Sequence, residues 1–286
     1  INYIVSSGRV ANPQLSVENF VVKGKIADNK IEATVSSTDD QQNKKLLIST
    51  LIERDSLDYK LTLDCHDFYL MNEPWSIVPD NYILFGEQGM LIHNISLSKS
   101  GSNISITSAN NRFNDDLNIS FANFKLNDIL GIIEKDSNMV RGTLVGNVLL
   151  KRVDHSYGII ANAQINQLFV TGIPIGDLSV KAENPTAERF DLYVNLTGAD
   201  NNVTAEGYYN PNGAENSIHI NIDIPSLSMK TIKAFSMGQI TEASGNVSGN
   251  FIINGASNSP EISGKLVFNN AFIVPTALYN RIELKQ

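Results

Sequence analysis

The densest group of titratable side chains in the sequence is Asp64-Cys65-His66-Asp67. An enzyme needs a nucleophile, a base and a group that orients them, and this cluster holds a thiol, an imidazole and carboxylates. In an extended chain, however, Asp64 and His66 point to one face while Cys65 and Asp67 point to the other. Cys65 is also the only cysteine, so the chain has no internal disulfide and no site built from several thiolates. We therefore predict that this cluster is not a functional site.

The second polar run, Asn110 to Asp116, has enough side-chain oxygens to suggest calcium binding. It lacks the glycine and the terminal glutamate of an EF-hand loop, so we interpret it as a hairpin tip. The sequence contains no Gly-x-Ser-x-Gly elbow, phosphate loop, Gly-x-Gly-x-x-Gly fingerprint or His-Glu-x-x-His motif. We predict a protein that is not an enzyme and that uses no cofactor and no metal.

Composition restricts the possible partners. The 286 residues are 42% hydrophobic and 18% charged, which is enough apolar surface for an extended core. The 22 basic and 30 acidic residues give a net charge of −8, which argues against nucleic-acid binding. No stretch approaches the roughly 18 consecutive apolar residues of a membrane-spanning helix. The chain begins at Ile1 without methionine, so we expect either a mature fragment or a piece cut from a longer protein, whose anchor, if any, lies outside.

Branched or aromatic residues alternate with small polar ones along most of the sequence. This period of two, with these residue types, is typical of half-buried strands. Short connectors such as Asp28-Asn29 and Gly101-Ser102 suit tight hairpins and leave no room for helical crossovers. The sequence thus predicts an all-β antiparallel meander, whose clearest strands are 20–25, 30–36, 45–53, 58–64, 82–85, 89–98, 103–107, 117–121, 157–163, 191–196, 203–209, 218–224 and 265–269.

One motif occurs twice, as Gly-x-apolar-x-Gly-Asn-apolar-x-apolar. The copies span 142–150 and 245–253, an offset of 245 − 142 = 103 residues. Each copy is preceded by a short stretch with a good N-cap residue and apolar positions spaced by three or four, which predicts amphipathic helices at 127–133 and 229–235. These helices either cover an end or open side of the sheet or form flaps over a ligand groove. A repeat in one register predicts an array of similar β-rich units.

The second copy continues in a pattern that resembles a known family. The runs 245–255, 259–266 and 271–275 form a Gly-rich strand, a small loop with Pro260, a further Gly264 and another strand. This resembles the TamB family, the inner-membrane, periplasm-spanning component of the translocation and assembly module, which is related to the AsmA-like lipid-transport proteins. The first copy fits the strand half of the pattern and departs after Leu150, where Arg152 to Ser156 replace the loop.

The resemblance implies a long sheet rolled into a half-pipe, or β-taco, with an apolar concave face. It also implies a cell-envelope protein in the periplasm of a Gram-negative bacterium, with an N-terminal helix in the inner membrane and a C-terminal region that meets an outer-membrane BamA/TamA-like barrel protein. We divide the chain into an N-terminal sheet segment, 1–125, a first repeat, 126–227, and a truncated second repeat, 228–286.

An open apolar stripe of this length exceeds the few hundred Å² that soluble monomers usually expose, so something apolar should cover it. Acyl chains suit such a face because they need area and shape and gain roughly 0.8 kcal/mol per buried methylene. The alternative is that the same side chains fill a closed core. The candidate lipid-groove residues are Ile104, Ile106, Ile119, Phe121, Leu144, Val148, Leu150, Leu192, Val194, Leu196, Ile218, Ile220, Ile222, Val247, Phe251 and Ile253.

The leading functional hypothesis is a groove for phospholipid transport between the inner and outer membranes, in support of outer-membrane biogenesis. A second hypothesis, also implied by the family, is an assembly factor that offers strand edges to outer-membrane or autotransporter proteins. A third is an adhesin-like or glycan-binding repeat protein with a closed core. A conduit needs a continuous open face, an assembly factor needs unpaired edges, and a glycan binder needs exposed aromatic residues clustered on a polar surface.

Overall fold

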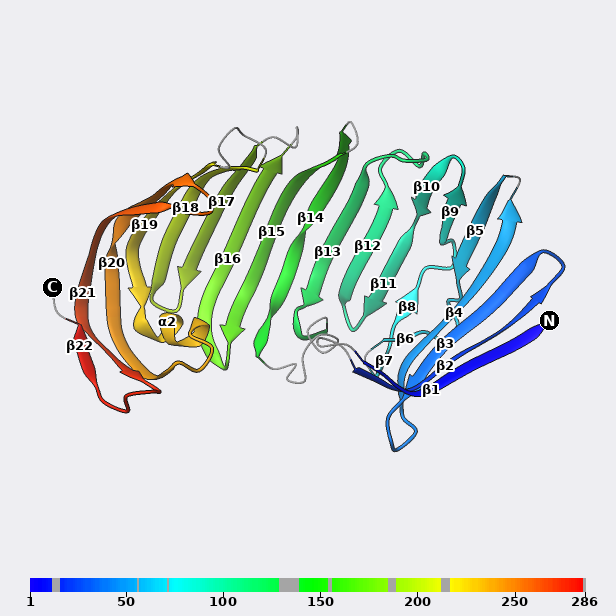
Figure 1. The fold of residues 1–286 in the computed structure, drawn as a ribbon, viewed down its shortest axis with the longest axis horizontal. Coiled ribbons are helices and arrows are strands. Elements are labelled where there is room, and N and C mark those ends of the chain that lie inside the picture. The colour runs from blue at the N-terminus through cyan, green and yellow to red at the C-terminus, as the bar shows by residue number, and fades with distance from the viewer. Residues whose placement is uncertain are drawn as a thin grey trace. The chain divides into compact units, whose positions relative to one another are not determined.

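The computed structural model describes residues 1–11, 16–55, 57–70, 72–128, 139–153, 156–184, 189–211 and 217–284. Almost all of them lie in strands, which pair antiparallel into two sheets. Neither sheet closes on itself (Figure 1). The predicted all-β antiparallel meander is confirmed. The contacts divide the chain into two units, namely unit 1 (Ile1–Ser137 and Asn147–Arg152) and unit 2 (Asn138–Gly146 and Val153–Gln286). The predicted division at 125 and 227 stays a prediction.

Unit 1 contains two groups of paired strands. In the first, the order is β1-β2-β3-β4-β5-β9-β10, and the short strands β6 and β7 extend from β4. In the second, β8 pairs with β11, β11 with β12, and β12 with β13. The strands are β1 (Asn2–Ala11), β2 (Ser16–Ala27), β3 (Lys30–Thr38), β4 (Lys44–Asp55), β5 (Asp58–Leu63), β6 (Tyr69–Leu70), β7 (Glu73–Pro74), β8 (Ser76–Ile77), β9 (Tyr82–Gly86), β10 (Gly89–His93), β11 (Ile95–Lys99), β12 (Ser102–Ser108) and β13 (Leu117–Lys125).

The strands of unit 2 belong to one sheet and follow chain order from β14 to β22. The long strands β19, β20 and β21 are bowed along their length (Figure 1). The elements are β14 (Val140–Val153, divided between the two units), β15 (Ser156–Val170), β16 (Ile173–Asn184), β17 (Phe190–Gly198), β18 (Asn201–Asn210), β19 (Ser217–Ser228), the helix α2 (Met229–Phe235), β20 (Ile240–Ala256), β21 (Glu261–Pro275) and β22 (Ile282–Leu284).

One predicted strand, 89–98, is wrong because it is two strands. Asn94 adopts a left-handed backbone conformation with φ 49°, which ends β10 and begins β11 in a different sheet. Asparagine tolerates this conformation because its short polar side chain bonds nearby backbone, and here its Nδ2 donates to the Asp80 carbonyl at 3.0 Å. Alternation of side chains alone does not reveal such a break.

The two predicted helices have different outcomes. The second is confirmed as α2, with Ser228 as the N-cap residue whose side chain accepts a hydrogen bond from the Lys230 backbone N–H. For the first, Asn127 and Asp128 are helical, and the remainder of 127–133 lies outside the described residues.

The repeated glycine motif falls on equivalent parts of β14 and β20. Gly146 and Gly249 have φ values of 148° and 142°, a region that side-chain-bearing residues rarely adopt. A Cβ atom at either position would overlap a carbonyl oxygen of the neighbouring strand, that of Asn162 for Gly146 and that of Lys265 for Gly249. The motif therefore marks places where two backbones approach closely.

This close approach predicts the effect of adding a methyl group. Gly249→Ala should lower the free energy of unfolding by about 1–3 kcal/mol, because the backbone conformation is strained and the added Cβ meets main-chain atoms. Urea denaturation followed by circular dichroism measures the change. Gly8→Ala is the matched control, since Gly8 also lies in a strand but has no atom within 4 Å of an added Cβ. Equal destabilisation by both variants would contradict the explanation.

Candidate functional site

The candidate residues of unit 2 lie on one face of the sheet. Residues directly opposite one another on antiparallel strands point to the same side. Val194 lies opposite Ala205, Ala205 opposite Ile222, and Ile222 opposite Phe251. The pairings thus bring together a set that we call the unit 2 apolar face: Leu192, Val194, Leu196, Ile218, Ile220, Ile222, Val247, Phe251 and Ile253.

Sequence reasoning missed several members of this face. Leu178 and Val180 on β16 lie opposite Leu196 and Val194. Their own alternation with Ser179 and Lys181 was the signal that pointed to them. The face also includes a glycine, since Gly207 lies opposite both Leu192 on β17 and Ile220 on β19. No side chain fits at this position, because a Cβ atom added to Gly207 would overlap the His219 carbonyl oxygen on β19.

Burial along the unit 2 apolar face is uneven. Val247 is 2% exposed, whereas the other candidate residues of the face are half-buried. Their neighbours on the opposite face are more exposed, as shown by Tyr193 at 38% and Ile252 at 40%. The apolar face is therefore the more sheltered side of the sheet, yet most of it is not sealed as a core would be.

Helix α2 covers one end of this face. Met229 from the helix forms a buried cluster with Val247 and Ala271, and Ile232 packs against it. The helix contacts β16, β19, β20 and β21, and Figure 1 shows it beside the ends of these strands. This position matches the interpretation of the helix as a cover over an end of the sheet.

A buried polar network fastens α2 to the sheet. Asn201 is 4% exposed, and its Nδ2 donates to the Ile175 carbonyl at 2.8 Å. Its Oδ1 accepts hydrogen bonds from the Ser228 backbone N–H at 2.9 Å and from the Thr231 hydroxyl at 3.0 Å. One side chain therefore connects β16, the end of β19 and the helix. Because each buried polar atom has a partner, the network holds the helix in one place.

Unit 1 has a smaller apolar face made of Ile104, Ile106, Ile119 and Phe121. Ile104 lies opposite Phe121, and Ile106 lies opposite Ile119. All four side chains are half-buried. At one end of this face the Phe121 ring meets the edge of Phe124 at a centroid distance of 5.9 Å, and Phe124 stacks on Trp75 at 6.0 Å.

The remaining candidates lie on β14. Leu144 belongs to unit 2, whereas Val148 and Leu150 belong to unit 1. All three are half-buried, and within unit 1 alternation places Val148 and Leu150 on the same side of β14.

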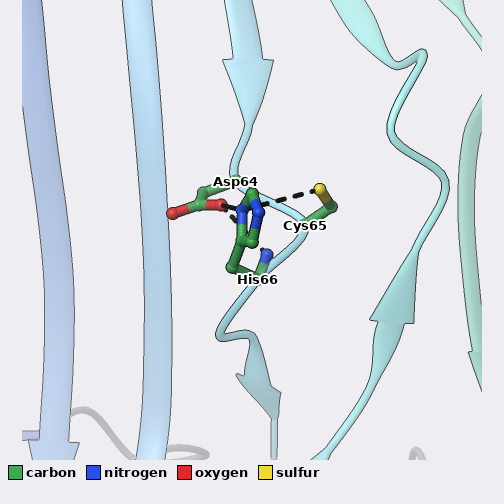
Figure 2. Close-up of side chains that lie close together, drawn as sticks. All are labelled: Asp64, Cys65 and His66. Atoms are coloured by element: carbon green, nitrogen blue, oxygen red, sulfur yellow. Dashed lines mark hydrogen bonds and ion pairs between the residues drawn. The ribbon is translucent and has the colours of Figure 1, made fainter.

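The Asp64 cluster differs from its prediction. The argument from alternation is wrong there because β5 ends at Leu63 and residues 65–67 form a bend. The ligand atoms of Asp64, Cys65 and His66 all lie within 4.8 Å of one another, and Figure 2 shows the thiol and the carboxylate on either side of the imidazole. Hydrogen bonds from the His66 backbone N–H and then from its ring hold the pKa of Asp64 below its usual value.

The run 110–116 connects β12 to β13, in agreement with its interpretation as a hairpin tip. Asp115 Oδ2 accepts a hydrogen bond from the Asn110 backbone N–H at 2.8 Å, and its Oδ1 accepts one from the Asp116 N–H at 2.9 Å. These bonds lower the pKa of Asp115, with the Asn110 bond as the largest cause. The carboxylate therefore stabilises the turn.

Within the described residues, no helix has the length and hydropathy that crossing a membrane requires. Comparison with protein-family models, with curated proteins and with solved structures returned no match. The function must therefore be inferred from the two apolar faces and from the polar groups described above.

The Asn201 network gives a stability prediction. Asn201→Ala should lower the free energy of unfolding by about 2–3 kcal/mol, because it leaves the buried Ser228 N–H and the Ile175 carbonyl without their partner. Thermal and urea denaturation measure the change. Asn202→Ala is the control, since this neighbour is exposed and should change stability by less than about 0.5 kcal/mol. A fully stable Asn201→Ala variant would show that the network does not secure the helix.

Proposed function

We propose that this chain is a non-enzymatic lipid-binding protein whose apolar faces hold the acyl chains of phospholipids. The proposal rests on the side-chain types and the incomplete burial of the unit 2 apolar face. Its side chains are branched or aromatic, they form continuous cross-strand rows, and away from α2 they are half-buried. A soluble protein that leaves such a surface available has an apolar ligand or partner for it.

Acyl chains match this surface physically. Along the rows from β17 to β20 the face is apolar, as in the series Val194, Ala205, Ile222 and Phe251. An acyl chain has no polar atoms to satisfy and gains roughly 0.8 kcal/mol for each methylene that leaves water. Polar side chains lie on the other face, where Tyr193, Glu206 and Asn221 occupy consecutive strands. The sheet can therefore present one side to lipid and the other to water.

The cellular role follows from the resemblance to the TamB family. We infer that the protein transports phospholipid between the inner and outer membranes and lies in the periplasm of a Gram-negative bacterium. An inner-membrane anchor and an outer-membrane barrel protein of the BamA/TamA type are the proposed partners. The support for this role is the Gly-rich repeat of β14 and β20, together with apolar faces that need no reacting group.

The central prediction concerns bound lipid. Ile222→Asp combined with Phe251→Asp should abolish co-purification of phospholipid, because the two residues lie opposite each other on the apolar face and the charges would meet the acyl chain. The measurement is organic extraction of the purified protein followed by lipid mass spectrometry, with uptake of a fluorescent phospholipid from vesicles as a second readout.

The matched control is the adjacent pair on the opposite face. Asn221 and Ile252 also lie opposite each other on β19 and β20, so Asn221→Asp with Ile252→Asp places two carboxylates on the same strands while sparing the apolar face. This variant should retain its lipid. Circular dichroism checks that both variants fold. A wild-type protein that is folded but carries no lipid and takes none from vesicles would refute the proposal and favour a closed core.

A second candidate function rests on the strand β1. This strand pairs with β2, and it exposes Ile4 (71%), Val5 (63%) and Val10 (47%). An exposed apolar strand edge can add a strand from another protein, as in β-augmentation. The proposed use is capture of nascent outer-membrane strands. The N–H of Ile4 points away from β2, because Ile1 and Ile26 form a hydrogen-bonded pair and such pairs alternate along the ladder. An Ile4→Pro substitution that abolishes binding of an amphipathic strand peptide, while lipid uptake is unchanged, would favour this function.

A further inference from the structure

The bend after β5 brings three metal-binding donors of different kinds together. Asp64 supplies a carboxylate, Cys65 a thiol and His66 an imidazole. His66 Nδ1 lies 2.8 Å from Asp64 Oδ1 and 3.8 Å from Cys65 Sγ, and all three donor atoms lie within 4.8 Å of one another. From this geometry we propose that Asp64, Cys65 and His66 form a binding site for a single borderline-soft divalent cation such as Zn²⁺.

The spacing suits a tetrahedral cation. Zinc binds sulfur, nitrogen and oxygen at about 2.0–2.3 Å, which places the ligands of a tetrahedral site about 3.3–3.8 Å apart. The separations of 2.8 and 3.8 Å found here lie close to that range, so small side-chain rotations are enough to enclose the cation. Three protein ligands leave a fourth position for water or for an external ligand.

The donor types select the class of metal. A thiolate together with an imidazole favours zinc and its neighbours in the transition series, whereas calcium and magnesium prefer sites made of oxygen. The nearby carboxylate of Asp67 is already paired with Lys44 Nζ at 3.0 Å, so it is the natural control residue.

Hydrogen bonds fix the chain on both sides of the bend, at Leu63 and at Phe68. Asn81, which is 2% exposed, accepts a hydrogen bond from the Leu63 N–H at 2.9 Å and donates to the Leu63 carbonyl at 3.1 Å. On the other side Phe68 is 6% exposed, and its carbonyl accepts a hydrogen bond from the Trp75 N–H at 2.9 Å. Fixing both flanks lowers the conformational entropy that metal binding has to overcome.

Within the bend, Asp64 Oδ1 accepts the hydrogen bond from the His66 backbone N–H at 3.0 Å, which keeps the bend closed and holds this oxygen beside the imidazole. A carboxylate oxygen has two lone pairs, so the same Oδ1 can also ligate the cation. The site lies in unit 1 and involves none of the apolar-face residues, so it stands independently of the proposed lipid function.

The test uses the whole reduced chain and Co²⁺ as a spectroscopic probe, followed by competition with Zn²⁺ against a chromophoric chelator. We expect one cobalt per chain, the visible absorption of tetrahedral cobalt and a thiolate-to-cobalt charge-transfer band. Cys65→Ser should remove the charge-transfer band, and both Cys65→Ser and His66→Gln should weaken zinc binding by at least about tenfold. Asp64→Asn keeps the Oδ1 acceptor, so a loss of affinity in this variant is assigned to the missing charge.

Asp67→Asn is the matched control and should leave both the spectrum and the zinc affinity unchanged. Circular dichroism confirms that each variant is folded. Failure of the wild-type chain to bind cobalt, a stoichiometry of two chains per metal, or an unchanged charge-transfer band in Cys65→Ser would each overturn the proposal.

Discussion

Backbone hydrogen bonding between strands that follow one another in the chain is the interaction on which both units depend. In unit 2 every strand from β15 to β21 pairs antiparallel with its sequence neighbours. The fully buried apolar side chains gather near the end covered by α2, among them Ile175, Ile224 and Met229. Main-chain hydrogen bonds therefore hold together a wide sheet in which few buried apolar side chains contribute to stability.

This way of holding a sheet together leaves its apolar side available. In a two-layer fold a second sheet or a set of helices would cover such a face. In the described part of unit 2 the only helix is α2, and its contacts are confined to one end. A half-buried face is then the expected outcome, because each side chain is sheltered by its cross-strand neighbours and by little else. The same arrangement is what makes the sheet suitable for the proposed lipid binding.

Features set by residues close together in the sequence were predicted, whereas features set by contacts with another strand were not. The extent of α2 and its N-cap Ser228 were correct because capping and apolar spacing act within one turn. Most strands were found through alternation, yet the long strands β1 and β16 and the short strands β6, β7, β8 and β22 were missed. The β16 segment opens with Pro174 and Gly176, and a register shift against β15 falls at that point. Such a shift depends on the neighbouring strand, and single-strand patterns do not contain it.

The candidate sites show the same limit. Shared faces within each unit follow from parity once the strands are known, so the apolar residues were identified correctly as neighbours. The arrangement of the Asp64 cluster was predicted wrongly because parity was applied beyond the last residue of β5. The end of a strand is set by contacts with distant residues. One example is the hydrogen bond from the Leu63 N–H to Asn81 Oδ1, which joins residues 18 positions apart in the chain. Sequence alternation contains no information about that contact.

The glycine motif shared by β14 and β20 sets a rule for how such a chain can lengthen. One period contains β14, β15, β16, β17, β18 and β19, which are six strands. Because antiparallel strands alternate in direction, only an even number of strands returns a duplicated segment to the same orientation. A duplication of an odd number of strands would reverse the direction of the strand that carries the motif. If its apolar residues stayed on the same face of the sheet, its glycines would then make their close approach at the edge away from the next strand. Growth of the sheet by duplication is thus restricted to whole hairpins, whatever the length of the loops between them.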